Sequence, residues 1–426
     1  MASAPAAQPG LRTDQLSSQD DFYVPAYRVL LNGKDQQQLV QDILSVTFHD
    51  SLTEVDSVDL IVNNWDPGDP VQGQAVQGKF RYHNSSLFDP GQQLEIQMGY
   101  YRRGKDDLQQ MMLGKISSMA PNFPASGGST LTVRALSLLH QFRTKQKTMQ
   151  FKNKTDSQIA QQIVQDINKD VHSPGGGKKI PNIKIQMLDQ EVQNNIKQNK
   201  EKPWPYLEMH NQYPIVFLMQ RSREVGYDIS VDDQTDSSGL RTVTFHYRLN
   251  KSVLRPSYVL VWGTSLISFQ PTLQTARQVD AVTVNGWNVQ TKQPISKTVK
   301  RADLVQKGQK LIMPQDLGMT DNPMADQMEV IVDRGLSSPD EAQQIAERTL
   351  LQISQQFIEA KGKTIGVPDL RAGSKVQICM RAADVTSNSP ADRFSGIYQV
   401  TETTHTFSDS GYTTDFSCRM ESKTFL

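Results

Sequence analysis

The clearest periodic signal lies in residues 93–101, where apolar and polar side chains alternate. Leu94, Ile96 and Met98 share one face of an extended chain, so the stretch predicts a β-strand with one buried face and one solvent-exposed face. Similar short runs predict strands at 27–31, 43–49, 58–62, 113–119 and 130–135. Asn32-Gly33 is a strong hairpin signal. Because no helical pattern interrupts these strands, residues 22–142 are expected to form a first small β-barrel or sandwich.

The stretch 46–66 occurs a second time at 267–288. A shift of 221 positions aligns Phe48 with Phe269, and a one-residue insertion at Ala281 then brings Trp65 onto Trp287. The other identical pairs are Leu52 with Leu273, Val58 with Val279, Asp59 with Asp280, Val62 with Val284, and Asn63 with Asn285. A shift of 282 positions aligns Gly91, Ile96, Met98 and Gly114 with Gly373, Ile378, Met380 and Gly396. This repeat predicts a second, related β-barrel at 258–426, with an inserted segment and helix at about 289–362.

The middle of the chain, residues 143–257, has a mixed pattern. Thr155 precedes a helix whose Ile159, Ile163 and Ile167 recur at four-residue spacing, and a second helix is expected after Pro214. The segments 227–231 and 241–247 read as a hairpin. The Gly-rich stretch 173–179 lacks the flanking strand and the Lys-Ser/Thr ending of a phosphate-binding loop, so a surface loop is the better interpretation. A small α+β module is therefore expected between the two barrels.

The insertion carries a well-formed helix start. Ser338 is placed as the N-cap, Pro339 as the first helical residue, and Glu341 is positioned to bond back to the cap. The expected apolar face comprises Ala342, Ile345, Ala346, Leu350, Ile353 and Phe357, with Gly362 ending the helix. The last hairpin is predicted to run out along 396–406, turn at 408–411, and return with Tyr412, Phe416, Cys418 and Met420 on one face. The fold class is thus mainly β with α+β parts.

Composition narrows the class of protein. Lysine plus arginine and aspartate plus glutamate number 45 each, so the chain lacks the basic footprint of a nucleic-acid-binding protein. Cys379 and Cys418 could form a bridge, but two buried thiols in a cytosolic protein are favoured. Residues 1–21 are polar and Ala/Pro/Gln-rich, and they predict a flexible lead without a signal peptide. No apolar run approaches the length of a membrane span, so synthesis in the cytoplasm without stable membrane insertion is expected.

Candidate chemistry is sparse. The chain contains no HExxH, GxSxG or CxxC motif, and no GxGxxG after a strand. The histidines at 49, 83, 140, 172, 210, 246 and 405 form no pair at metal-ligand spacing. Asp59 and Asp280 are expected to fix turns or bind nearby backbone rather than form a catalytic pair. Trp65 and Trp287 could stack on a sugar, but their recurrence favours a core or barrel-end position. We therefore assign no catalytic, cofactor-binding or metal-binding residues, and expect a structural protein rather than an enzyme.

Several segments together resemble one known family. They are the Asn-Gly after the first strand, Val284-Asn-Gly-Trp-Asn288 with its following Lys-Gln-Pro-Ile turn, Ser338-Pro-Asp-Glu-Ala342, Gly366-Val-Pro-Asp-Leu370 with Gly373, and the ending from Ser395-Gly-Ile-Tyr398 through Thr404-His-Thr-Phe407 to Gly411-Tyr-Thr-Thr414. This combination is similar to the phage late control gene D family, which includes baseplate hub proteins of contractile tails and the N-terminal hub part of VgrG spike proteins. The resemblance spans nearly all of residues 22–421.

The resemblance implies a homotrimeric baseplate hub of a contractile injection system. Such a hub adapts the sixfold symmetry of an inner tube to the threefold symmetry of a central spike, and two barrels per subunit would give six similar barrels in a ring. Only Lys423-Thr-Phe-Leu426 follows the last strand, so a separate spike protein near the C-terminal end is expected. The tube or a tube-initiator protein and other baseplate components are the further expected partners, and the protein would work in the baseplate of a phage tail-like particle. The alternatives are a tail-associated adhesin or glycan-binding protein and, less favoured, a cell-wall hydrolase.

Overall fold

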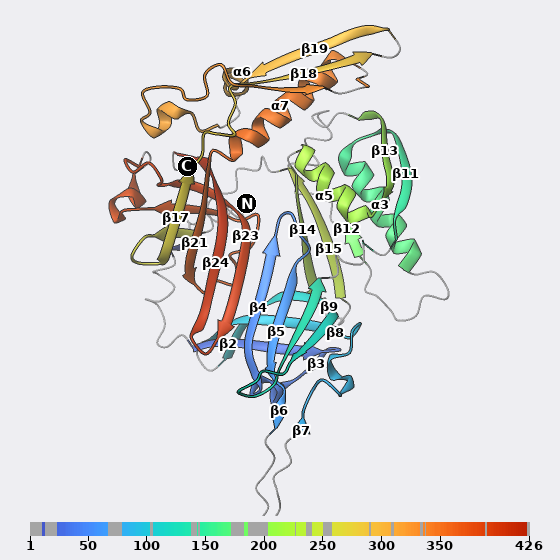
Figure 1. Ribbon diagram of the computed structural model, residues 1–426, viewed down its shortest axis with the longest axis vertical. Coiled ribbons are helices and arrows are strands. Elements are labelled where there is room, and N and C mark those ends of the chain that lie inside the picture. The colour runs from blue at the N-terminus through green and yellow to red at the C-terminus, as the bar shows by residue number, and fades with distance from the viewer. Residues whose placement is uncertain are drawn as a thin grey trace, which may run out of the picture.

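A computed structural model describes residues 11–12, 24–66, 79–102, 105–137, 143, 145–171, 183–185, 203–225, 227–235, 241–249, 258–288, 291–307, 311–332, 335–336, 338–387 and 390–423. The fold is mainly β, and its centre is one 14-stranded, mostly antiparallel sheet (Figure 1). Strands from both predicted β units belong to this single sheet. The predicted Gly-rich loop at 173–179 lies outside the described residues.

The first unit contributes the strands β2 (Val24–Leu31), β3 (Lys34–Asp35), β4 (Ile43–Ser51), β5 (Ser57–Asn63), β8 (Gln93–Arg102), β9 (Lys105–Asn122) and β10 (Thr130–Ser137). All six strands predicted here are confirmed, and β9 is much longer than expected. Asn32 and Gly33 have φ values of 52° and 78°, which is the backbone twist that the predicted β2–β3 hairpin requires. Shorter elements are α2 (Gln37–Val40), β6 (Trp65–Asp66), β7 (Lys79–Phe80) and η1 (Ser86–Phe88).

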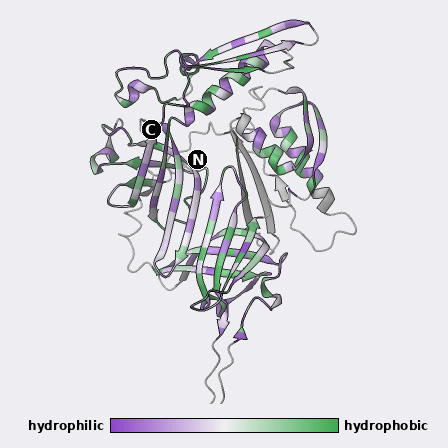
Figure 2. Ribbon diagram, viewed as in Figure 1, coloured by the Kyte–Doolittle hydropathy of each residue, from purple (hydrophilic) through white to green (hydrophobic). Residues whose placement is uncertain are grey.

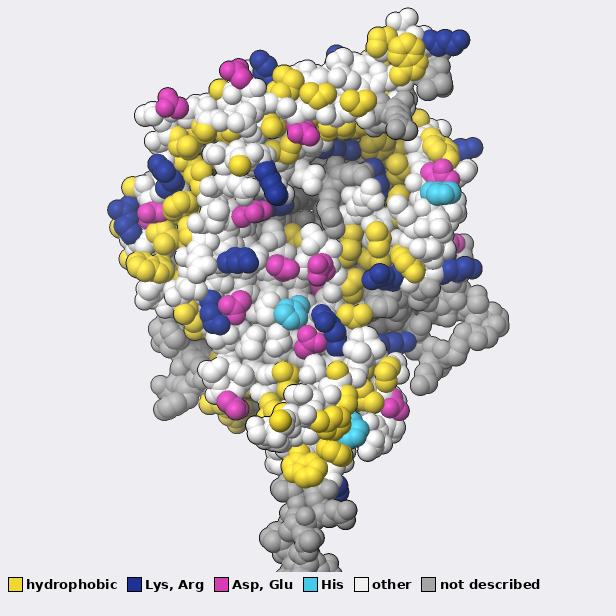
Figure 3. Space-filling view, viewed as in Figure 1, with side chains coloured by type: hydrophobic (Ala, Val, Ile, Leu, Met, Phe, Trp, Pro, Cys, Tyr) yellow, Lys and Arg dark blue, Asp and Glu magenta, His cyan; other side chains and the backbone are white. Residues whose placement is uncertain are grey.

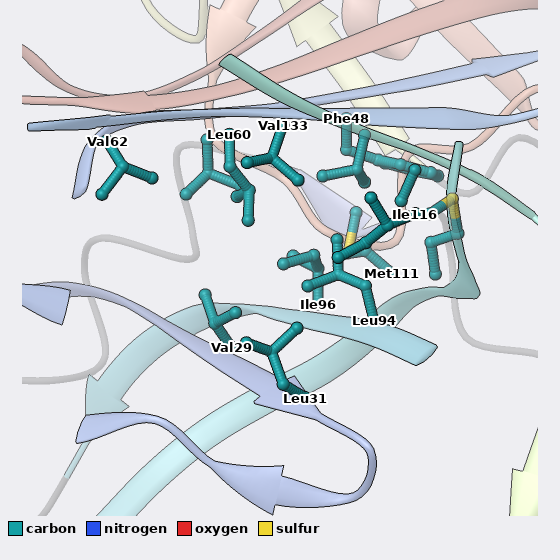
Figure 4. Packing of buried hydrophobic residues seen from close by; sticks show 14 of the residues in the cluster. Val29, Leu31, Phe48, Leu60, Val62, Leu94, Ile96, Met111, Ile116 and Val133 are labelled. Atoms are coloured by element: carbon teal, nitrogen blue, oxygen red, sulfur yellow. The ribbon is translucent and has the colours of Figure 1, made fainter. Parts of the chain in front are cut away.

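Alternation along these strands produces a two-layered core. Leu60, Val62 and Val133 project from one layer toward Val29 and Leu31 of β2 in the other (Figure 4). Each of these side chains is at most 2% exposed. The core therefore forms because one sheet curls back over itself and buries the apolar faces of its longer strands.

The second unit contributes β16 (Tyr258–Val261), β17 (Leu266–Leu273), β21 (Ile358–Ile365), β22 (Lys375–Cys379), β23 (Gly396–Ser408) and β24 (Gly411–Ser422), with the short helix η4 (Ala382–Thr386). The predicted last hairpin is confirmed, and its four apolar return-strand residues are all buried. Cys379 and Cys418 are free, buried thiols, as favoured from the sequence.

The two units share one topology. Five strands of the first unit follow the order β4-β5-β10-β9-β8, and five of the second follow β17-β21-β24-β23-β22, with all neighbours antiparallel. The β-bulges also coincide, at Leu44 and Ile267 in the first strands and at Ser117 and Thr401 in the fourth. The sixth strands differ, because β2 runs antiparallel to β8 whereas β16 runs parallel to β22.

A matched hydrogen-bond pattern fixes the alignment. Gly91 donates its N–H to Ile116 and Gly373 donates to Val400, and both glycines have positive φ. This confirms the sequence match of Gly91 with Gly373. The same alignment makes Tyr398 the counterpart of Gly114. The sequence match to Gly396 is therefore wrong by two residues.

The repeat within the 267–288 stretch needs a larger correction. The bulges and strand pairs align Phe48 with Pro271, two residues from Phe269. The structural counterpart of β5 is β21, and not the strand β18 (Ala281–Asn288) that the sequence matched to it. The reason is that β18 leaves the large sheet with the insertion, and β21 pairs with β17 in the place that β5 occupies beside β4.

The insertion folds as a separate layer. Strands β19 (Gln293–Lys300), β18 and β20 (Met328–Val332) form a three-stranded outer sheet, and α7 (Pro339–Gln355) covers one face of it (Figure 1). The Ser338 hydroxyl accepts the Glu341 N–H, which confirms the predicted cap. The bands of both colours along α7 in Figure 2 reflect its amphipathic pattern. The segment also contains α6 (Arg301–Gln306) and η3 (Pro314–Leu317).

The predicted end of this helix at Gly362 is wrong. The helix ends at Gln355, and Gly362 lies inside β21 opposite Phe416. A Cβ atom at Gly362 would come within 2.3 Å of the Phe416 ring. The glycine is therefore needed to make room for that ring, and not to end a helix.

The middle module contains β11 (Lys147–Lys154), α3 (Asp156–Val171), β12 (Ile183–Ile185), β13 (Trp204–Gln212), α5 (Pro214–Val225), β14 (Tyr227–Thr235) and β15 (Arg241–Leu249). Both predicted helices and the β14–β15 hairpin are confirmed. Ile159, Ile163 and Ile167 are buried in the module's own core, as the spacing predicted.

Within the N-terminal lead, β1 (Leu11–Arg12) pairs in parallel with β16. The expectation of a flexible lead is therefore wrong for these two residues, because the open edge of β16 offers them backbone partners. The other residues of 1–21 lie outside the described residues. Within the described part of the chain, no helix combines the length and apolar composition that crossing a membrane requires.

Candidate functional site

Within the described residues, the candidate polar side chains do not come together as a reaction centre. Asp59 lies beside Arg134 and His49 on the large sheet, whereas Asp280 sits in the insertion, where its backbone carbonyl accepts the Arg301 N–H. Among the described residues, no three His, Cys, Asp or Glu side chains come together to hold a metal ion. His140 and His172 lie outside the described residues, as does the side chain of His246.

The two repeated tryptophans have different surroundings. Trp65 is half-buried and packs edge-on against Phe80, with ring centroids 5.3 Å apart. Trp287 is 47% exposed. The prediction of a core position is therefore wrong for Trp287, because β18 turns this side chain to the face of the outer sheet opposite the one that packs with α7.

The most informative region is the junction where the two units meet edge to edge. Residues Ser45–Ser51 of β4 pair with Ser408–Glu402 of β23 in an antiparallel ladder. The strand β23 changes partner along its length, because its first residues pair with β22 and its later ones with β4. Phe407 and Tyr412 of the second unit pack on the core of the first. The junction is therefore a continuation of both sheet and core.

A polar network lies beneath this ladder. The Asp50 carboxylate accepts hydrogen bonds from Arg371 Nε at 2.6 Å and from the Ala372 N–H at 3.0 Å. The Arg371 guanidinium also stands 4.7 Å from the centre of the Phe48 ring. Both donors bind the same carboxylate oxygen, Oδ2, and the guanidinium stacks on an aromatic ring, so this ion pair ties the β4 end of the first unit to the turn before β22.

Two further groups of the network hold unusual protonation states. Burial, aided by the charge of Arg371, lowers the pKa of His405 to about 3, and its ring nitrogens bond to Leu370 O and to Tyr412 Oη, each at 3.0 Å. Burial, followed by the nearby Asp50 carboxylate, raises the pKa of Asp56 well above its ordinary value. The junction therefore holds a neutral imidazole and a carboxyl that tends to keep its proton.

The other face of the same sheet is polar and continuous across both units. Lys363 bonds to Asp415 at 3.1 Å, and the next strands carry Thr404 and His49, whose side chains are also 3.1 Å apart. Figure 3 shows scattered charges of both signs on an otherwise uncharged polar surface over these central strands. Hydroxyl and paired charged groups thus cover the outer side of the strands whose inner side forms the two cores.

Sequence reasoning missed the junction residues. Asp50, Arg371 and His405 are far apart in the chain and form no spaced motif. Only the alternation of β4, which places Asp50 on the same face as buried Val46 and Phe48, gave a signal. A carboxylate on an apolar face predicts a buried partner, but it does not say which residue supplies it.

Comparison with solved structures identifies the fold. The 43 kDa tail protein of prophage MuSo2 from Shewanella oneidensis has a TM-score of 0.60 at 12% identity, with 93% of this chain and 99% of that chain covered. The tail protein from Neisseria meningitidis MC58 has a TM-score of 0.59 at 12% identity, with 94% and 97% covered. The chain therefore has the fold of phage tail proteins over nearly its whole length.

The sequence comparisons add little to this. A family model described as the Alg8 N-terminal domain matches residues 23–189, which is less than half of the chain. No curated protein matches the sequence.

Proposed function

We propose that the chain is the structural hub of a contractile, phage tail-like baseplate, acting as a homotrimer that joins a sixfold inner tube to a threefold spike. The shared fold with two tail proteins supports the class of protein. The observation that carries the trimer is the pair of units with one topology, joined edge to edge in a single sheet. Three such chains supply six similar units, which matches both symmetries.

The polar face gives this ring a channel lining. When sheets close around an axis, one face turns to the lumen and the other to the surrounding protein. The apolar faces of both units are already filled by their cores, so the face with Lys363, Asp415, Thr404 and His49 is the one available to line a water-filled passage. Closure into two separate barrels, as the sequence predicted, is not required for this arrangement.

The direction of β24 supports a placement of the two proposed partners. Strand β24 runs toward the outer sheet and α7, so the C-terminal end lies near that layer (Figure 1). We place the spike at this end, and the tube or its initiator at the opposite end, where the 408–411 turn and β6 lie. Other baseplate components would contact the outside of the ring.

The test is the solution mass of the purified chain, measured by light scattering over a concentration series with and without the candidate spike protein. The expected result is a mass near three times 47.8 kDa, either alone or when the spike is added. A chain that stays monomeric at every concentration and ignores the spike would overturn the proposal.

One observation favours the glycan-binding alternative. Trp287 is exposed on an open sheet face, as a sugar-stacking residue must be. That function predicts binding to cell-surface glycans that Trp287→Ala abolishes while the mass of the particle is unchanged. Wild-type protein that binds no glycan in the same assay would remove this candidate.

A further inference from the structure

We infer that neighbouring copies of the chain join through the outer edge of β17 and the distal half of β9, repeating between subunits the β4–β23 junction that is built within one. This inference rests on the proposed function, and it names the surfaces that the trimer would use. It follows from the structural alignment of the two units and from what each leaves uncovered.

The first step is the equivalence of the edges. In the alignment fixed by the bulges, β17 is the counterpart of β4 and β9 is the counterpart of β23. Strand β4 has β5 on one side and β23 on the other. Among the described residues, β17 has β21 on one side and no strand on the other, and β9 beyond Ile116 pairs only with β10. The two edges that meet inside the chain thus have two open counterparts.

The second step is a pair of phenylalanines. Phe407 of β23 crosses the junction and packs on the first unit, with its ring 4.5 Å from that of Tyr27. The bulge alignment makes Phe123 its counterpart, just past the end of β9. Phe123 is 56% exposed, although it touches Phe80 at one edge. Phe407 is therefore half-buried in the junction within the chain. Its counterpart Phe123 is exposed at the edge where another copy would be the partner.

The receiving edge is exposed in the same way. Ile267, at the bulge of β17, is 56% exposed, and the nearby Trp262 is 57% exposed. An open strand edge beside large apolar side chains invites pairing with another chain. The second copy is the occupant that the alignment specifies, because its β9 carries the counterpart of the strand that fills the same edge in the first unit.

The alignment also predicts the strand register of the contact between copies and its strength relative to the internal junction. Transferring the β4–β23 pairs places Gln270 opposite Asn122 and Pro271 opposite Pro121 of the next copy. Leu52 donates its N–H to Thr401, so alternation turns the N–H of Phe48, the counterpart of Pro271, toward the junction. Two prolines that face each other remove two ladder hydrogen bonds. The contact between copies is therefore weaker than the internal junction, and its formation depends on concentration or on the spike.

The test is a disulfide across the predicted contact. Gln270 and Asn122 are exposed and form a non-hydrogen-bonded pair in this register, where side chains lie closest. The full-length Gln270→Cys/Asn122→Cys chain is oxidised under mild conditions at high concentration and run on a non-reducing gel. We expect a covalent trimer that reduction dissolves. A mixture of the two single variants should stop at a covalent dimer, because each chain then carries only one of the two cysteines and can form only one link.

The matched control places one cysteine on β21, the strand next to β17, and keeps the other at position 122. Lys361 is exposed and lies beside Gln270 on β21, away from the edge, so Lys361→Cys/Asn122→Cys should give no covalent trimer. Trimers seen by light scattering without the Gln270–Asn122 link would overturn the predicted contact and leave the hub intact. A chain that is monomeric by light scattering under all conditions would overturn the proposed function, and this inference with it.

Discussion

The two units have the same five-strand order but reach it along different paths. In the first, a short turn joins β4 to β5; in the second, the outer sheet and α7 intervene between β17 and β21. The edge next to β4 is filled by β23, whereas the edge next to β17 is open. The comparison teaches that the place of a strand is set by the edge it pairs with, and not by its neighbour in sequence.

The largest expected effect is the dependence of folding stability on pH that the buried His405 gives to the junction. His405 has a folded pKa of about 3, below its unfolded value of 6.5, so the folded state binds fewer protons between these values. Stability should fall as pH drops through this window, by up to about 1.4 kcal/mol per pH unit. Urea unfolding at several pH values measures this, and His405→Gln should flatten the slope.

Asp56 contributes the opposite slope. Its folded pKa lies above the unfolded value of 3.8, so its contribution weakens stability as pH rises above 3.8. Asp56→Asn should therefore increase the unfolding free energy at neutral pH relative to wild type. An unchanged pH profile in both variants would contradict the assignment of these protonation states.

Removing the ion pair beneath the junction should have the next largest effect. Asp50→Ala removes the carboxylate that accepts from Arg371 Nε and from the Ala372 N–H, which should cost about 3 kcal/mol. Asp415→Ala is the control, because its pair with Lys363 is largely exposed and should be worth less than about 1 kcal/mol. Equal losses in chemical denaturation would show that the junction is no more important than the polar face.

The next prediction concerns one matched pair of core positions that the two units fill with side chains of different volumes. Leu60 faces Val133 in the first unit, and the counterparts in the second are Gly362 and Phe416. Gly362→Leu should destabilise by about 2 kcal/mol through overpacking. Adding Phe416→Val should recover much of the loss, so a double-mutant cycle should give a favourable coupling. Additive losses would mean that the second core does not repeat the packing of the first.

The smallest effect on stability is expected at Phe123. Phe407→Ser should lower the free energy of unfolding by about 2 kcal/mol, because it withdraws a ring from the junction. Phe123→Ser should change it by less than about 0.5 kcal/mol but weaken trimer formation in light scattering. A Phe123 variant that unfolds as readily as the Phe407 variant would show that Phe123 already serves the isolated chain.

Local pattern was sufficient for most elements. Alternation located β8 and β10, and the Ser338-Pro339 start located α7, because strand period and helix capping depend on adjacent residues. Pairing was harder to predict. Identical residues led to a wrong match of β18 with β5. Gly362 was predicted to end a helix, because its close packing against Phe416 is not visible in the sequence. The alternation of β4 indicates that Asp50 needs a buried partner, but the partner could not be predicted, since only the folded sheet brings Asp50 and Arg371 together.

The partner change along β23 has a mechanical consequence. Because β4 and β23 lie antiparallel with their hydrogen bonds perpendicular to the strands, a pull along the strands loads every bond of the ladder from Ser45 to Ser51 at once. Such a pull shears the junction, so its bonds must break together and cannot open one after another. A force directed along these strands therefore meets more resistance at the junction than a force that peels β23 away from β4.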